Sequence, residues 1–219
     1  ASYSGDLSAS FCRDSQRILE SEVYTDIFGQ VIGGKGLVKN SEYFETEGGG
    51  FYKSVGVGGS LTGRRGDIAI IDDPVKDAME AYSETSRSRV WEWYTNVLET
   101  RLHNESATIL IMTRWHEDDL AGRLLDVERE KWDIINIPAI YEGIENEYDH
   151  RRVGEALWPE RHNVEKLERL RSLSPRTFAA LYQQSPVSLG GNIIKTEWFE
   201  KISPRDFQTI RHKEPIIFF

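Results

Sequence analysis

The chain has 219 residues, of which 39% are hydrophobic and 11% aromatic, so it can form a packed core and is not a disordered protein. Its formal net charge of −9 excludes a uniformly basic surface for nucleic acid, although a local basic surface remains compatible with it. A single cysteine, Cys12, excludes a disulfide framework and an all-cysteine metal site, and fits a reducing compartment.

The N-terminal part of the sequence predicts one helix followed by a glycine-rich region. Apolar residues recur on one side of residues 6–21, which predicts a helix. Glycines are frequent over residues 29–66 and separate strand-like pieces at 51–52 and 55–57. We therefore expect tight turns between short strands in this region.

The middle of the sequence alternates strands with helices. The apolar run 67–71 predicts a buried strand that closes with Asp72-Asp73-Pro74. The next predicted elements are a helix over 83–102, a buried strand over 107–112, a helix over 116–126 and a third strand over 132–137. This order is typical of a mainly parallel sheet with helices on both faces and ligands at the carboxyl ends of its strands. Asp72-Asp73 and Thr113-Arg114 follow two of these strands, so we expect them at one edge.

The C-terminal quarter differs from the rest in charge. Residues 1–160 hold 17 basic and 30 acidic side chains, whereas residues 161–219 hold 10 basic and 6 acidic ones, which predicts a separate subdomain. Two short helices are predicted there, over 163–173 and 175–184. Ser174 is the expected cap of the second, with Pro175 at its first helical position, and Gly190-Gly191 indicates a linker.

The pair of adjacent carboxylates is the most informative element. Asp72 and Asp73 resemble the Walker B arrangement of nucleotide triphosphatases, in which the first acid holds Mg²⁺ and the second orients or deprotonates the attacking water. Side chains alternate along a strand, so the two acids point to different places, as two roles require. The alternative is an Asp-Asp-Pro turn that only ends the strand.

Thr113, after the next strand, is the second candidate. Its hydroxyl could bind a γ-phosphate or its water and report the nucleotide state; alternatively, Thr113 caps the helix that follows. Glu117, Asp118 and Asp119 could ligate a metal, but acids in a first helical turn are also favoured by the helix dipole.

The sequence contains no complete phosphate-binding loop with the spacing G-x-x-x-x-G-K-[ST]. Gly33-Gly34-Lys35-Gly36 lacks a hydroxyl after its lysine, and Lys195-Thr196 lacks the preceding glycine. The five histidines have no paired ligand spacing, and hydrolase signatures such as G-x-S-x-G are absent. A Walker B pair alone indicates part of an ATPase or no ATPase.

A series of short motifs runs through nearly the whole chain. In order, they are GSLTGR at 59–64, IIDDP at 70–74, EAYS at 80–83, TRWHEDDL at 113–120, GRL at 122–124, WP at 158–159 and ALYQQ at 180–184. Each motif is weak alone, but their order and spacing together resemble the large subunit of tailed-phage terminases, the motor that pumps viral DNA into a procapsid.

The resemblance implies a three-layer ATPase domain of the P-loop class, a small helical linker and an RNase H-like endonuclease domain. On this basis residues 1–160 would be the ATPase domain without its phosphate-binding loop, 161–190 the linker subdomain, and 191–219 a linker with the start of the nuclease domain. The phosphate-binding loop would lie upstream of Ala1. The nuclease carboxylates would lie beyond about Ile216. The chain begins with Ala and ends on the strand-like run 215–219, so we expect a piece of a longer protein, inactive alone.

The resemblance also implies ATP and Mg²⁺ as cofactors. Asp72 would hold the metal, Asp73 would be the catalytic carboxylate, and Thr113 would contact the nucleotide. Many terminases carry Glu where this chain has Asp73, whose side chain is one methylene shorter. Arg64 or Arg65, in the turn before the Walker B strand, could be an arginine finger for a neighbouring subunit, or else a solvated turn or a DNA-backbone contact.

The expected setting is the cytoplasm of a bacterial host. The partners would be double-stranded DNA, a portal protein, a small terminase subunit and further copies in a homo-oligomeric ring. No membrane contact is expected, because no apolar run approaches the roughly 18 residues of a membrane span. Two hypotheses remain beside this one: a stand-alone two-metal nuclease using Asp72, Asp73 and the acids at 117–119, and a non-catalytic, prophage-derived interaction module.

Overall fold

The computed structural model describes residues 1–61, 63, 65–143 and 147–186. All of them lie in the first of two compact units, Ala1–Val187. The second unit, Ser188–Phe219, lies outside the described residues, and so do the predictions made for the linker at Gly190-Gly191 and for the run 215–219.

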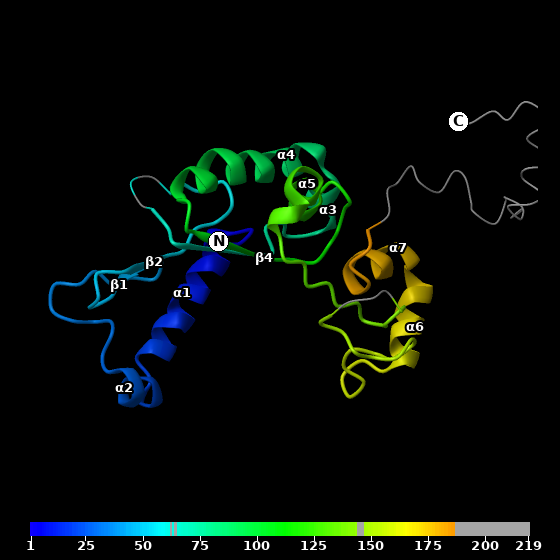
Figure 1. Cartoon of the computed structure of the whole chain (residues 1–219), viewed down its shortest axis with the longest axis horizontal. Helices are drawn as coiled ribbons and strands as arrows, with labels where there is room; N and C mark the ends of the chain where they lie inside the picture. Colours follow the sequence, from blue (N-terminus) through cyan, green and yellow to red (C-terminus); the bar gives the residue numbers. More distant parts are fainter. Residues whose placement is uncertain (62, 64, 144–146, 187–219) are drawn as a thin grey trace, which may run out of the picture. The chain divides into compact units, whose positions relative to one another are not determined.

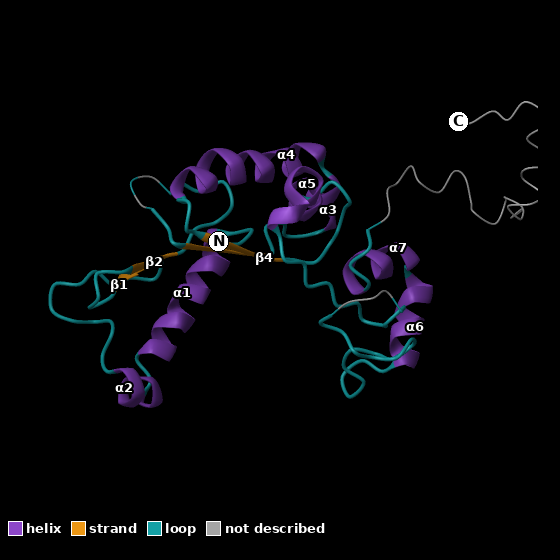
Figure 2. Cartoon of the chain, in the orientation of Figure 1, coloured by secondary structure: helices purple, strands orange, loops and turns teal. Residues whose placement is uncertain are grey.

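The described chain contains helices and short strands (Figures 1 and 2). The helices are α1 Gly5–Leu19, α2 Glu22–Phe28, α3 Ala78–Tyr82, α4 Glu84–Trp93, α5 Leu120–Glu128, α6 Val164–Leu173 and α7 Pro175–Thr177. The strands are β1 Tyr43–Glu45, β2 Phe51–Lys53, β3 Ile68–Asp72 and β4 Ala107–Ile111. The prediction of a mixed α/β protein is confirmed.

The strands form a small parallel sheet and a separate hairpin. β3 and β4 pair in parallel, with Ile70 opposite Ile109. Ser2 forms parallel bridges to Asp72 on one side and to Gly56 on the other, so the first residues of the chain run beside β3. The predicted strand at 55–57 is reduced to this single bridge. β1 and β2 pair in antiparallel fashion.

The two faces of the parallel sheet differ in exposure. On one face, Ala69 and Ile71 are buried in a core with side chains of α4 and α5, among them Val90 and Leu120. The other face carries Ile68, Ile70, Ile109 and Ile111, which are 46–65% exposed. Parallel sheets normally bury both faces. Among the described residues, the expected helical cover is therefore present on one face only (Figure 1).

The long helix predicted over 83–102 is found in place, but its geometry changes along its length. Ser83 caps α4 by accepting the N–H of Ser86 at 3.2 Å. After α4 the chain continues as a π-helical turn, Tyr94–Leu98, and then as a 3₁₀ turn, Glu99–Arg101. The indole of Trp93 donates to the carbonyl of Gly59 at 3.0 Å and so ties α4 to the glycine-rich region.

The prediction of a third strand over residues 132–137 was wrong. This stretch has no strand assignment, and the N–H groups of Asp133, Ile134 and Ile135 make no hydrogen bond to any described residue. A strand requires a neighbouring edge to pair with. The apolar pattern is real, but no partner edge reaches it in the described chain.

The C-terminal helices build a second, smaller core. Ser174 caps α7 with Pro175 at its first position, as predicted, and Asn163 caps α6. The buried residues of this core are Ile140, Ala156, Leu167 and Phe178. It therefore includes residues that precede the helices. None of the helices in the described part of the chain is long and apolar enough to cross a membrane.

Candidate functional site

Asp73 occupies a strained position at the carboxyl edge of the parallel strands. Its φ of 43° lies in the left-handed region, which costs a residue with a side chain about 1–3 kcal/mol. Its backbone is fixed on both sides, because its N–H donates to the carbonyl of Ile111 at 2.9 Å and its carbonyl accepts from Tyr3 at 3.0 Å. Ile111 of β4 and the N-terminal segment at Tyr3 hold the chain in this conformation.

Asp73 and Thr113 meet at this edge. The Asp73 Oδ1 atom accepts the backbone N–H of Thr113 at 3.2 Å, which confirms that the two predicted clusters lie at the same edge. The Thr113 side chain is half-buried, and its hydroxyl makes no hydrogen bond within the described residues. Thr113 does not cap the next helix, because the cap of α5 is Asp119.

Asp72 is the last residue of β3 and lies opposite Ile111. Burial raises the pKa of its carboxyl group, and the charge of Asp73 raises it further. Two adjacent carboxylates with mutual repulsion form a set of hard oxygen donors that a divalent cation would stabilise. The residues therefore fit Mg²⁺.

The described residues contain no group of three His, Cys, Asp or Glu side chains that could hold a metal ion. A cation at Asp72 would thus take most of its ligands from water or from a bound phosphate. Mg²⁺ binds in this way in nucleotide sites, through one or two carboxylates plus substrate phosphates.

Two of the three acids at 117–119 serve structural roles. Asp119 is buried and accepts two hydrogen bonds from Arg114 Nε, at 2.8 and 2.9 Å, while its Oδ1 also caps Gly122 N–H at 2.9 Å. Asp118 binds Arg123 at 2.7 Å and Arg87 at 3.0 Å. These contacts explain why α5 starts at Leu120 and not at His116. They leave no acidic cluster at 117–119 for the two-metal nuclease hypothesis.

The electrostatics of the two acids differ. Hydrogen bonds from Arg123 lower the pKa of Asp118 to about 2, with burial opposing and Arg87 assisting. Burial raises the pKa of Asp119, while its ion pair with Arg114 opposes that rise. The backbone of Gly122 also packs closely against the carbonyl group of Glu117. A Cβ atom at position 122 would lie 1.8 Å from that carbonyl oxygen. Glycine is thus required at position 122.

Arg65, one of the two candidates for an arginine finger, lies at the opposite edge of the sheet, before β3. Arg64 is outside the described residues, and Arg65 is exposed in the turn that precedes β3. That turn is anchored by Gly66, whose N–H donates to the carbonyl of Arg101 at 3.0 Å and whose carbonyl accepts from Ser106 Oγ at 2.7 Å. Because β3 spans about 16 Å, Arg65 is well separated from Asp73 of its own chain.

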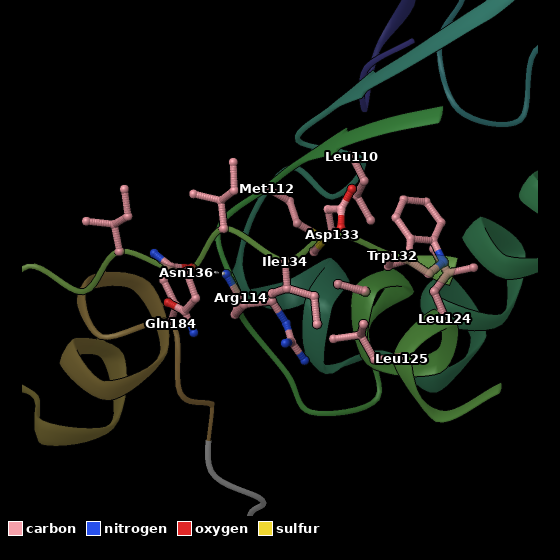
Figure 3. Close-up of a pocket in the computed structure, with 13 residues that line it drawn as sticks. Leu110, Met112, Arg114, Leu124, Leu125, Trp132, Asp133, Ile134, Asn136 and Gln184 are labelled. Carbon is pink, nitrogen blue, oxygen red and sulfur yellow. Dashed lines mark hydrogen bonds between the residues drawn. The ribbon is translucent and has the colours of Figure 1, made fainter. Parts of the chain in front are cut away.

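A cavity of about 340 Å³ lies beside the carboxyl end of β4 (Figure 3). Its walls come from the end of β4, from α5 and from the stretch that follows α5, including Met112, Leu124 and Trp132. Arg114 and Gln184 also line it, and the side chain of Gln184 accepts the backbone N–H of Arg114 at 3.1 Å. Sequence reasoning missed Gln184 as a site residue. Nothing in the local pattern places it beside a residue 70 positions earlier.

One family model matches most of the chain. It describes the N-terminal part of the terminase large subunit, T4-like virus type, and its match covers residues 38–201. The matched range includes β3, β4, α5 and the C-terminal helices, and hence the edge that carries Asp73 and Thr113. No curated protein matches the sequence.

Proposed function

The chain belongs to this family of terminase large subunits, and on that premise we propose that it is part of the ATP-driven motor that packages viral DNA into procapsids. The observation that carries the proposal is the hydrogen bond between the Asp73 carboxylate and the Thr113 amide. It brings two strand ends together at the edge where parallel sheets bind ligands.

The proposed chemistry is ATP hydrolysis. Asp72 would hold Mg²⁺, which would neutralise negative charge on the phosphate oxygens of ATP. Asp73 would orient or deprotonate the attacking water. Thr113 N–H occupies Asp73 Oδ1. The other carboxylate oxygen would then face water, and the Thr113 hydroxyl would be available to sense the γ-phosphate.

The proposed function requires segments of the protein other than residues 1–219. It places the phosphate-binding loop in a segment outside residues 1–219, with a three-layer P-loop fold as the complete domain. It also places an endonuclease domain in the whole protein. The proposed partners are double-stranded DNA, a portal protein, a small terminase subunit and other copies in a ring.

The decisive experiment is steady-state ATP hydrolysis by the whole large subunit that contains this chain. We expect Mg²⁺-dependent hydrolysis that is lost in Asp73→Asn and retained in Glu117→Gln, because Glu117 is an exposed acid of the neighbouring turn. Absence of hydrolysis in the unmodified protein, with DNA and portal present, would favour the non-catalytic interaction module instead.

A further inference from the structure

Two non-glycine residues in the described part of the chain have positive φ, and both touch the same turn. They are Asp73, with φ of 43°, and Gln184, with φ of 53°. Asp73 Oδ1 accepts the N–H of Thr113 at 3.2 Å, and Gln184 Oε1 accepts the N–H of Arg114 at 3.1 Å. Consecutive amides of one turn are thus held by the two residues with strained backbones.

Gln184 is fixed from the other side as well. Its Nε2 donates to the carbonyl of Leu181 at 2.9 Å, which sets the direction of the amide group and points Oε1 at Arg114. The preceding residue, Gln183, binds both backbone groups of Ile140, at 3.0 and 2.9 Å. Gln184 therefore projects from a backbone that is tied to the C-terminal core. Figure 3 shows it against Arg114 at the cavity wall.

The two hydrogen bonds are mechanically linked through Thr113. The N–H of Thr113 and the N–H of Arg114 belong to adjacent rigid peptide planes that share the Thr113 Cα atom. A displacement of the Arg114 amide moves the Thr113 Cα atom, which is also one end of the plane that carries the Thr113 N–H, and so shifts that N–H relative to Asp73 Oδ1. Backbone strain in two residues that converge on one turn is the kind of outlier from which a functional role is inferred.

We propose that Gln184 is a positioning residue for Asp73, which it acts on through the amides of Arg114 and Thr113. This inference deepens the proposed function and rests on it for its catalytic part. Gln184 holds the Thr113–Arg114 turn so that Thr113 keeps one carboxylate oxygen of Asp73 occupied and the other directed at water. A shift of the C-terminal helical segment would alter the Asp73 carboxylate through the same contacts, and a change at Asp73 would pass back to that segment.

The structural link is tested in the 219-residue chain by amide hydrogen exchange, read by NMR. In Gln184→Ala we expect exchange at Arg114 to rise about tenfold, as for the loss of one hydrogen bond, and exchange at Thr113 to rise with it. Gln184→Glu keeps an acceptor at the same place and loses only the donor to Leu181, so both amides should stay protected. Gln30→Ala removes a glutamine that donates to the carbonyl of Ile32 at 3.1 Å, away from this turn, and serves as the matched control, with both amides expected within twofold of the unmodified chain.

The catalytic role is tested in the whole large subunit by ATPase kinetics. Gln184→Ala should lower kcat about tenfold with KM for ATP unchanged, and Gln184→Glu should restore kcat. The proposal is overturned if Arg114 loses protection while Thr113 does not, or if both lose protection and kcat is unaffected. If the unmodified subunit hydrolyses no ATP, the proposed function fails, and the exchange experiment still decides the link between Gln184 and Thr113.

Discussion

The Asp73 carboxylate accepts the backbone N–H of Thr113 at 3.2 Å, although the two residues are 40 positions apart in the sequence. The bond joins the ends of β3 and β4 and leaves the Thr113 hydroxyl without a partner among the described residues. The bond occupies Oδ1 of Asp73 and the backbone N–H of Thr113, and it involves neither Oδ2 of Asp73 nor the Thr113 hydroxyl. The first two predictions follow from this division.

Asp73→Asn in the whole large subunit should spare nucleotide binding and abolish hydrolysis. An amide can still accept the Thr113 N–H, so the edge should keep its shape, but it cannot act as a base or carry the charge that orients water. The expected loss of rate is about 10²–10⁴-fold. Asp72→Asn should instead weaken Mg²⁺-dependent ATP binding. Titration with a fluorescent ATP analogue, beside a turnover assay, separates the two; near-normal turnover in Asp73→Asn would assign the role to another carboxylate.

Thr113→Ala should bind ATP normally and package little DNA. The substitution removes the free hydroxyl and keeps the backbone N–H that Asp73 accepts, so the local fold should be preserved. Thr113→Ser is the matched control, because it retains the hydroxyl. Packaging by Thr113→Ala at the level of the unmodified protein would show that the hydroxyl takes no part in coupling.

Arg64 or Arg65 should act on a neighbouring subunit. Arg65 lies before β3, at the amino edge, so it cannot reach the Asp73 edge of its own chain. A mixture of the double variant Arg64→Ala, Arg65→Ala with Asp73→Asn should recover ATPase activity, since one subunit provides an intact site and the other an intact arginine. An arginine finger contributes about 10³–10⁵ in rate. Normal hydrolysis by the arginine variant alone would exclude both residues.

Asp119→Ala should destabilise the chain by about 3 kcal/mol in urea unfolding, because it leaves Arg114 without its buried partner and removes the cap of α5. Asp119→Asn keeps an oxygen that can accept the Gly122 N–H. The difference in unfolding free energy between Asp119→Asn and Asp119→Ala therefore measures the contribution of the helix cap. The difference between the unmodified chain and Asp119→Asn measures the contribution of the ion pair. Equal stability of Asp119→Asn and the unmodified chain would contradict a stabilising role of the ion pair.

Asp118 should make stability depend on acid pH. Its pKa is lowered to about 2, below the value near 4 of an unfolded aspartate. Its contribution to the free energy of unfolding is therefore fully present above about pH 4 and lost as the pH falls towards 2. Asp118→Asn should flatten this part of the curve and lower stability at pH 7, whereas Glu117→Gln should change neither. The carboxyl group is 41% exposed, so a small effect is expected.

The sequence by itself determined several local elements and the residue types of the candidate site. The caps Ser83, Asn163 and Ser174 mark helix starts that the structure confirms, because a capping side chain bonds to amides only two or three residues away. The acidic pair after an apolar run likewise marked the end of β3 correctly. Such signals are short in range and can be read along the chain.

The tertiary structure decided the contacts that local sequence patterns left open. The sequence alone allows the acids at 117–119 to bind a metal. In the folded chain, Asp118 and Asp119 instead form ion pairs with Arg87, Arg114 and Arg123. Residues 132–137 have the pattern of a strand and lack a neighbouring edge within the described residues. Gln184 reaches Arg114 across 70 positions, and a contact of that separation depends on how the chain packs, which local pattern does not encode.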